Sequence, residues 1–148
     1  MADALSPSDL FRAANILALL GWLVLALLPF WRGSQMVSAI IIPLILSVGY
    51  AAITISNLGG WPEGASFSTL EGVKTLFSLD EMILVGWVHF LAFDLFIGAW
   101  EARDAKRRGI HHLFLLPCLF FTFMFGPAGL LLYFIIRTVK ARGVPALD

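Results

Sequence analysis

Four long runs of apolar residues, separated by shorter polar connectors, dominate the pattern of this chain. They extend over Ala13 to Trp31, Met36 to Ile55, Met82 to Trp100 and Leu113 to Ile136. A helix needs about 20 apolar residues to cross the hydrocarbon core of a bilayer, so each run is long enough for one crossing. The pattern predicts an all-α polytopic integral membrane protein, with four transmembrane helices in one bundle and a single membrane domain over residues 1–148.

The connectors carry signals for helix starts. Residues 6–9, Ser-Pro-Ser-Asp, are typical of a helix N-terminus ahead of the first run, which we interpret as a retained membrane helix rather than a signal peptide. In the longest connector, capping-box spacing occurs at Ser68 with Glu71 and again at Ser78 with Glu81. We therefore expect a short interfacial helix over about Thr69 to Phe77, between the second and third membrane helices.

Composition supports the membrane class. Hydrophobic residues make up 59% of the chain, charged residues only 14%, and the mean hydropathy is +0.89. Too little polar surface remains for a soluble globule, and nothing in the charge balance suggests nucleic acid as a partner. The lone Cys118 excludes an intrachain disulfide, and we interpret it as a core residue.

Lys and Arg in the connectors do not decide the orientation in the membrane. If four helices cross, Arg12, Lys74, Arg137, Lys140 and Arg142 lie on one side, and Arg32, Arg103, Lys106, Arg107 and Arg108 lie on the other. The two sides tie. The dense basic cluster between the third and fourth runs slightly favours a cytoplasmic location for that connector.

Candidate chemistry centres on the third run, which contains His89 and Asp94. An acidic side chain near the centre of a membrane helix costs about 2.5–3.5 kcal/mol on insertion scales, so it normally faces the protein interior or a wet cavity. The two side chains are about 140° apart around a helix and about 7.5 Å apart along it. We expect both to point into one enclosed site if the third helix is surrounded by the other three.

Further polar residues extend this candidate site. Glu101 shares the helical stripe of Asp94 and Gly98, and Asp104 follows it, which suggests a graded acidic path from the membrane surface. A structural alternative is that Asp94 pairs with Arg12, Arg32 or Arg137. The spacing of the carboxylates and of His111 and His112 does not favour a metal site, and no cofactor is expected.

The fourth run contains proline and glycine at membrane depth. Pro117 and Pro127 each remove a helical hydrogen bond, and Phe125-Gly126-Pro127-Ala128-Gly129 predicts a kink. Irregular backbone inside a bilayer needs protein or a water-filled cavity around it, so this segment is expected to face His89 and Asp94. Close helix packing through small residues is the alternative explanation.

These motifs resemble a known family. The stretch 86–98, Gly-Trp-Val-His-Phe-Leu-Ala-Phe-Asp-Leu-Phe-Ile-Gly, together with Asp104, Gly109, Pro117-Cys118 and the Phe125–Gly129 run, is similar to the neoxanthin-synthase-like family named for plant abscisic acid deficiency four. The similarity spans about Gly86 to Tyr133. The chain looks more like compact bacterial members, which suggests a bacterial cytoplasmic membrane. In plants, the family implies conversion of violaxanthin to neoxanthin, an epoxide-to-allene isomerisation.

The resemblance implies a membrane-embedded isomerase acting on a carotenoid or other isoprenoid lipid. His89 and Asp94 would then be the catalytic acid and base, in either assignment, with Glu101 and Asp104 as secondary polar groups. The expected substrate-binding residues are Trp87, Phe90, Phe93, Gly98, Phe125, Gly126, Pro127 and Gly129. The alternative is a non-catalytic protein that binds a hydrophobic pigment or lipid, or stabilises a membrane complex. Membrane lipids and a second copy of the chain are further possible partners.

Overall fold

The computed structural model describes residues 6–140, and every regular element in that range is helical. Three helices are long and apolar enough to cross a membrane: α1 (Pro7–Leu27), the continuous stretch Ser34–Ser56 and α5 (Asp80–Arg107). The stretch Ser34–Ser56 consists of α2 (Ser34–Met36), a π-helical segment η1 (Val37–Ile41) and α3 (Ile42–Ser56). The remaining helices are α4 (Leu70–Leu76), α6 (His112–Phe125) and α7 (Pro127–Lys140).

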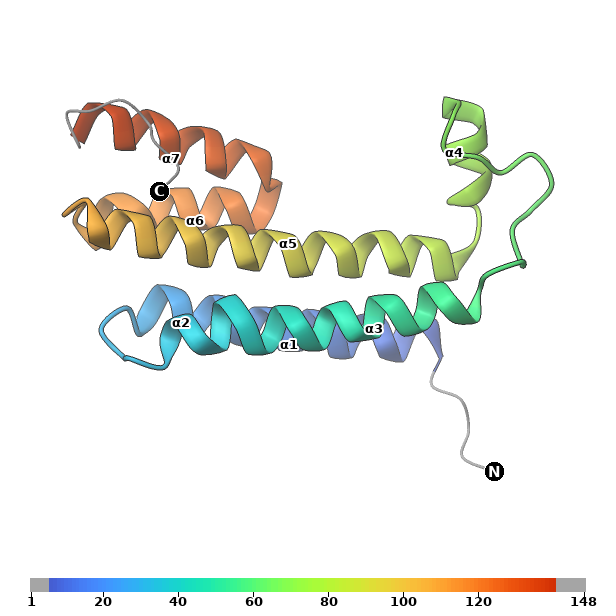
Figure 1. Ribbon diagram of the computed structural model, residues 1–148, viewed down its shortest axis with the longest axis horizontal. Coiled ribbons are helices and arrows are strands. Elements are labelled where there is room, and N and C mark those ends of the chain that lie inside the picture. The colour runs from blue at the N-terminus through green and yellow to red at the C-terminus, as the bar shows by residue number, and fades with distance from the viewer. Residues whose placement is uncertain (1–5, 141–148) are drawn as a thin grey trace.

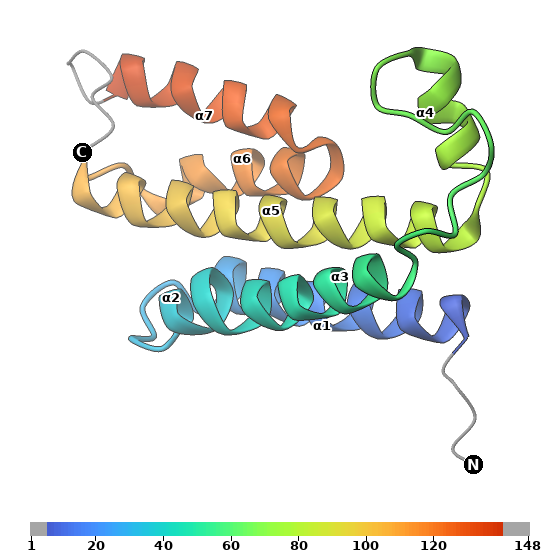
Figure 2. The ribbon, with the colours of Figure 1, turned by 45° about the vertical axis from the view of Figure 1, so that its right-hand side comes forward.

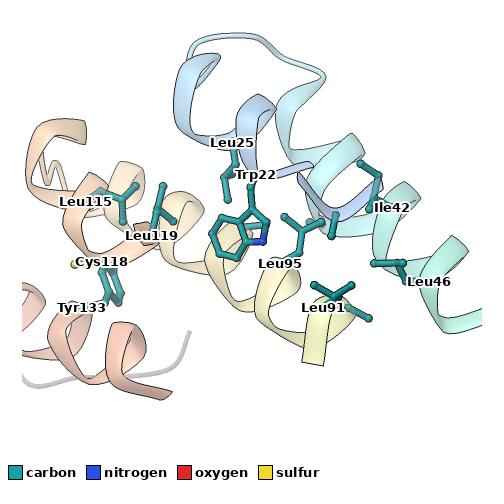
Figure 3. Packing of buried hydrophobic residues seen from close by; sticks show 14 of the residues in the cluster. Trp22, Leu25, Ile42, Leu46, Leu91, Leu95, Leu115, Cys118, Leu119 and Tyr133 are labelled. Carbon is teal, nitrogen blue, oxygen red and sulfur yellow. The ribbon is translucent and has the colours of Figure 1, made fainter. Parts of the chain in front are cut away.

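The long helix α5 is the centre of the fold. Helices α1 and α3 pack along one side of it, and α6 and α7 lie on the other side (Figures 1 and 2). Leu95 of α5 is fully buried and packs with Trp22 of α1 and Ile42 of α3 in a core that continues to Leu119 and Tyr133 near the other end (Figure 3). Outward-facing surfaces of the long helices carry many exposed large apolar side chains, as expected for lipid-facing helices.

Prolines affect the first two apolar spans, at the end of α1 and near the start of the second span. Helix α1 begins as the sequence predicts, because the Ser6 hydroxyl accepts a hydrogen bond from the Asp9 amide at 3.2 Å. It ends at Leu27 rather than near Trp31, since Pro29 has no amide hydrogen with which to continue the helix. In the next span, the π-helical segment precedes Pro43, which likewise cannot donate to the carbonyl of the preceding turn.

A short helix exists where the sequence predicts one, but both predicted capping boxes are wrong. The cap of α4 is Thr69 rather than Ser68, and its hydroxyl accepts a hydrogen bond from the Gly72 amide at 3.1 Å. Helix α5 follows Leu79 without a side-chain cap, because the Ser78 hydroxyl donates to the Thr75 carbonyl at 2.7 Å instead. Serine can bond back to a preceding carbonyl as readily as cap a following helix.

The fourth apolar run forms a helical hairpin, not a single kinked helix. Helix α6 ends at Phe125, and α7 begins at Pro127 and folds back along α6 (Figure 2). Gly126 joins them with φ of +48°, a backbone conformation that L side chains rarely adopt, and its amide donates to the Thr122 carbonyl at 2.9 Å. Glycine after a helix and proline at the start of the next are strong stop and start signals, so the chain reverses here.

The reversal changes which charges share an end of the molecule. Arg137 pairs with Asp104 and Lys140 lies over the Phe114 ring, so the last described turn of α7 is near the α5–α6 connection. Seven of the nine Lys and Arg residues in the described range are therefore at this end, which we call the basic end. They are Arg32, Arg103, Lys106, Arg107, Arg108, Arg137 and Lys140. Only Arg12 and Lys74 are at the other end.

The hairpin depends on close backbone contact at Gly129, and this generates a prediction. A Cβ on Gly129 would overlap the backbone nitrogen and the hydroxyl of Thr122, so Gly129→Ala must push α7 away from α6. We expect a loss of about 1–3 kcal/mol in the free energy of unfolding, the usual effect of overpacking. The measurement is unfolding of the purified protein in detergent by heat or by SDS.

Gly49 in α3 is the matched control, because a Cβ there meets nothing within 4 Å. Gly49→Ala should leave stability unchanged or raise it by about 0.5–1 kcal/mol through the better helix propensity of alanine. Equal stability of the two variants would show that the hairpin contact is looser than described.

Candidate functional site

Asp94 lies at the middle of α5 and faces the turn between α6 and α7. A Cβ placed on Gly126 would be 2.9 Å from Asp94 Oδ1 and 3.1 Å from Oδ2, so the carboxylate rests against the backbone of the turn. Asp94 is half-buried, and its Oδ2 atom is buried without a hydrogen-bond partner among the described residues. The absence of a side chain at position 126 therefore serves two purposes, the unusual backbone conformation and the space for this carboxylate.

Glu101 lies two helical turns from Asp94, on the same side of α5, and is fully buried. The Thr122 hydroxyl of α6 lies 3.0 Å from Glu101 Oε1 and 3.2 Å from Oε2, and it donates its hydrogen bond to this carboxylate. Thr122 is also the residue that Gly129 of α7 approaches backbone to backbone. Glu101 thus holds α6 against α5 at the residue, Thr122, that Gly129 of α7 contacts.

A second polar cluster lies further along α5, toward the basic end. The Tyr133 hydroxyl of α7 donates to Asp104 Oδ2 at 2.5 Å, and Arg137 Nε is 3.1 Å from the same oxygen. Arg108 Nε donates to both carboxylate oxygens at 3.0–3.1 Å. Asp104 and Arg137 are 4% and 2% exposed, and the Arg137 guanidinium also lies 5.9 Å from the Trp100 ring centroid. This cluster ties α7 to α5.

Together, these contacts join a series of carboxylates on α5 to the hairpin of α6 and α7. Sequence reasoning proposed Arg137 as a partner of Asp94, but it pairs with Asp104 instead. It did not identify Thr122, Tyr133 or Arg108. The sequence spacing could have indicated part of this cluster. Residues four apart share a helix face, so Asp104 can reach Arg108, and Tyr133 lies on the same face as Arg137. The Thr122 contact had no local signal, since it depends on how α6 packs.

His89 lies on a different flank from Asp94. Its ring stacks on Phe93 with centroids 4.6 Å apart and lies 5.9 Å from the Tyr50 ring of α3, and the residue is exposed. Asp94 instead faces the turn between α6 and α7. The structure does not bring these two residues together, because the 140° between them separates two different neighbours of a central helix.

The expected aromatic slot is also dispersed. Trp87 donates to Asn15 Oδ1 of α1 at 3.2 Å and lies next to Phe90, whereas Phe93 lines an apolar groove of about 320 Å³ between α3 and α5. Phe125 is 59% exposed beside the hairpin turn. These rings face three directions around the molecule, so they do not line one cavity.

The glycines and the proline of the expected binding set also lie in different places and do not line one cavity. A Cβ on Gly98 would lie 2.5 Å from Trp22 Cη2, so the space beside Gly98 is filled by an α1 indole and is not open to a ligand. Gly126 contacts Asp94, Gly129 contacts Thr122, and Pro127 is exposed at the start of α7. Gly126 is the member of the expected set that the structure places against the Asp94 carboxylate.

No group of three or more His, Cys, Asp or Glu side chains within residues 6–140 is arranged to hold a metal ion. His111 caps α6, its Nδ1 accepting from the Leu113 amide at 3.3 Å, and His112 Nε2 is 2.9 Å from the Ala26 carbonyl. Both histidines therefore have structural contacts at the start of α6.

The Asp104 cluster generates a stability prediction. Asp104→Asn removes the carboxylate that faces the buried Arg137 guanidinium, and we expect it to lower the free energy of unfolding by about 3–5 kcal/mol, the usual loss on breaking a buried ion pair. Glu71→Gln is the control, because Glu71 and Lys74 form an exposed i,i+3 pair at 3.8 Å. Its effect should be within error. Comparable losses in both variants, measured by thermal unfolding in detergent, would contradict a structural role for the cluster.

Comparison with known proteins adds the family. The model of the ABA4-like family, described as ABA DEFICIENT 4-like, matches residues 9–133, a range that begins in the first turn of α1, includes α5 and reaches Tyr133 of α7. No match was found among curated proteins, and none among solved structures. The match covers Asp94, Glu101, Asp104, Thr122 and the Gly126 turn, whereas Arg137 lies beyond it. This chain belongs to the ABA4-like family.

Proposed function

We propose that this protein is a membrane-embedded isomerase of a carotenoid or other isoprenoid lipid, and that Asp94 is its acid–base residue. Membership of the ABA4-like family supports a role related to carotenoid metabolism. The observation that carries the proposal is the Asp94 carboxylate, which has a buried oxygen without a hydrogen bond and rests against the Gly126 turn. An unsatisfied buried carboxylate is costly, so its presence at mid-helix favours a chemical role.

The chemistry needs one proton delivered and one removed. In an epoxide-to-allene isomerisation, a proton adds to the epoxide oxygen, the carbon–oxygen bond breaks, and a vinylic proton leaves as the cumulated double bond forms. Substrate and product contain the same atoms, and no oxidant or reductant is needed. A single carboxyl group suffices, because one oxygen donates a proton and the resulting carboxylate accepts the other proton. Asp94 thereby returns to its starting state.

Glu101 has a positioning role in this proposal. It is fully buried and hydrogen-bonded to Thr122, so it does not touch a substrate. Its carboxylate anchors the hairpin whose turn covers Asp94. His89, on the other flank of α5, is not part of the acid–base group and instead borders the groove that contains Phe93.

The second candidate function is binding without catalysis. The apolar groove between α3 and α5, lined by Phe93 and Phe96, favours a protein that holds a pigment or lipid. Asp94 would then serve only to seat the hairpin. The two functions differ in whether a substitution at Asp94 removes a product or only weakens the fold.

The topology forms part of the proposal. We infer that α1, Ser34–Ser56 and α5 cross the membrane and that α6–α7 is a re-entrant hairpin. Helices α6 and α7 have 14 residues each, about 21 Å at the helical rise, which is shorter than a hydrocarbon core of about 30 Å. With three crossings, the basic end faces the cytoplasm by the positive-inside rule, in a bacterial cytoplasmic membrane.

Activity after substitution of Asp94 tests the proposed function. The protein is produced in a host that makes an epoxy-carotenoid, and pigments are separated by chromatography. Asp94→Asn should lower product by about 100-fold or more, the usual contribution of acid–base catalysis, while the yield of folded protein is retained. His89→Phe keeps an aromatic ring for stacking on Phe93 and should leave product unchanged.

Three results would contradict the assignment. Loss of product in His89→Phe but not in Asp94→Asn would assign the reaction to the groove between α3 and α5. Pigments identical with and without the wild-type protein would favour the binding function. Product that falls only in proportion to the folded yield would give Asp94 a purely structural role.

Single cysteines test the topology. In a Cys118→Ala background, Lys106→Cys should react with a membrane-impermeant maleimide only after cells are permeabilised. Lys74→Cys should react in intact cells, because the two lysines are at opposite ends of the molecule. A cysteine at Thr138, near the end of α7, should behave like the one at position 106. Labelling of position 138 in intact cells would instead support a fourth crossing.

A further inference from the structure

A large cavity lies at the basic end, away from the turn that Asp94 faces. It measures about 880 Å³ and is enclosed by the α1–α2 connector, the last turns of α5 and the start of α6. Ligand pockets are typically about 300–1,000 Å³, so this volume is sufficient for a lipid headgroup and the first part of its chains. Gly126 is at the opposite end of α6, about 20 Å away at the helical rise, which makes this a separate site.

The cavity lining has a one-sided charge. Arg32, Arg103, Lys106 and Arg107 contribute four positive charges, and the lining includes no Asp or Glu. Arg32 comes from the α1–α2 connector, whereas the others come from α5, so the cations converge from two elements. The acidic residue nearest in the chain, Asp104, faces Tyr133 and Arg137 instead. Such a lining favours an anion.

The start of α6 adds to this field. Helix α6 begins at His112, and both His111 and His112 line the cavity. The first turn of a helix carries partial positive charge, which attracts an anion; the Leu113 amide itself donates to His111 Nδ1. Gln35 also lines the cavity, and its Oε1 atom is buried without a hydrogen-bond partner among the described residues. A ligand that offers a hydroxyl would satisfy this oxygen.

The remainder of the lining is apolar. Leu25 and Leu115 are buried at its base, and Pro29, Phe30 and Trp31 flank it. An anion alone would leave this surface in contact with water, whereas an amphiphile covers it with its chain. We propose that the cavity binds the phosphate group of an anionic membrane lipid, with the chain against Leu25 and Leu115. Clusters of Lys and Arg beside membrane helices are typical of such headgroup sites.

Binding of a defined lipid tests the inference. The purified full-length protein, in a neutral detergent, is mixed with phosphatidylglycerol, phosphatidylcholine or inorganic phosphate, and bound molecules are counted by native mass spectrometry. Phosphatidylglycerol, which has a net negative phosphate and free hydroxyls, should be retained in preference to phosphatidylcholine. The double variant Arg103→Gln/Lys106→Gln should weaken its retention by about tenfold or more.

Matched variants make the result specific. Arg12→Gln/Lys74→Gln removes two exposed charges from the other end and should retain the lipid within about twofold of wild type, since those charges are outside the cavity. Arg103→Lys/Lys106→Arg keeps the charges and should bind like wild type. The same elution volume in size-exclusion chromatography establishes that each variant is folded.

Several outcomes would overturn the proposal. Equal retention of the two lipids would exclude an anionic headgroup site. Equal losses in the two glutamine variants would indicate general surface charge and no built site. Displacement of the lipid by millimolar inorganic phosphate, with no preference for phosphatidylglycerol, would assign the cavity to a soluble anion.

Discussion

The contact between a carboxylate in the middle of α5 and the backbone of a helix reversal is the interaction on which the rest of the arrangement depends. Asp94 rests against Gly126, where no side chain is present and φ is positive, so the carboxylate lies in direct contact with the turn. A side chain at position 126 would meet the carboxylate and strain the backbone. The position of this turn determines where α6 stops and which face of α5 the hairpin covers.

From that turn, polar contacts follow α5 toward the basic end. Thr122 bonds to Glu101, and then Tyr133 and Arg137 meet Asp104. In a membrane, apolar burial contributes little to the association of helices, because lipid tails are as apolar as the side chains they replace. The attraction between these helices therefore comes from the close backbone contact at Gly129 and from the hydrogen bonds to this series of carboxylates. The same residues explain why so many ionisable groups are found on one apolar helix.

The two sides of α5 therefore have different properties. The side toward α1 and α3 is apolar, with Leu95, Trp22 and Ile42 in close packing, and it includes a groove next to Phe93. The side toward the hairpin is polar. His89 belongs to the first side and Asp94 to the second, which is why the proposed chemistry involves the carboxylate without the imidazole. The basic cavity is a third region, formed where α1 and α5 end and α6 begins.

Local patterns in the sequence determined the helical class, the three long apolar helices and the unusual position of Asp94, because hydropathy and helix spacing depend only on neighbouring residues. They also indicated the family through the residues from Gly86 onward. They did not decide between a kink and a reversal at Gly126-Pro127, since glycine and proline interrupt a helix in both cases. Only the tertiary structure decided this. It places α7 beside α6 through the close contact of Gly129 with Thr122, and it holds both helices against α5 through Glu101 and Asp104. The reversal placed Arg137 and Lys140 at the basic end. The packing of α3 and of the hairpin on different sides of α5 gave His89 and Asp94 different neighbours, because the partners of a central helix depend on how distant segments pack.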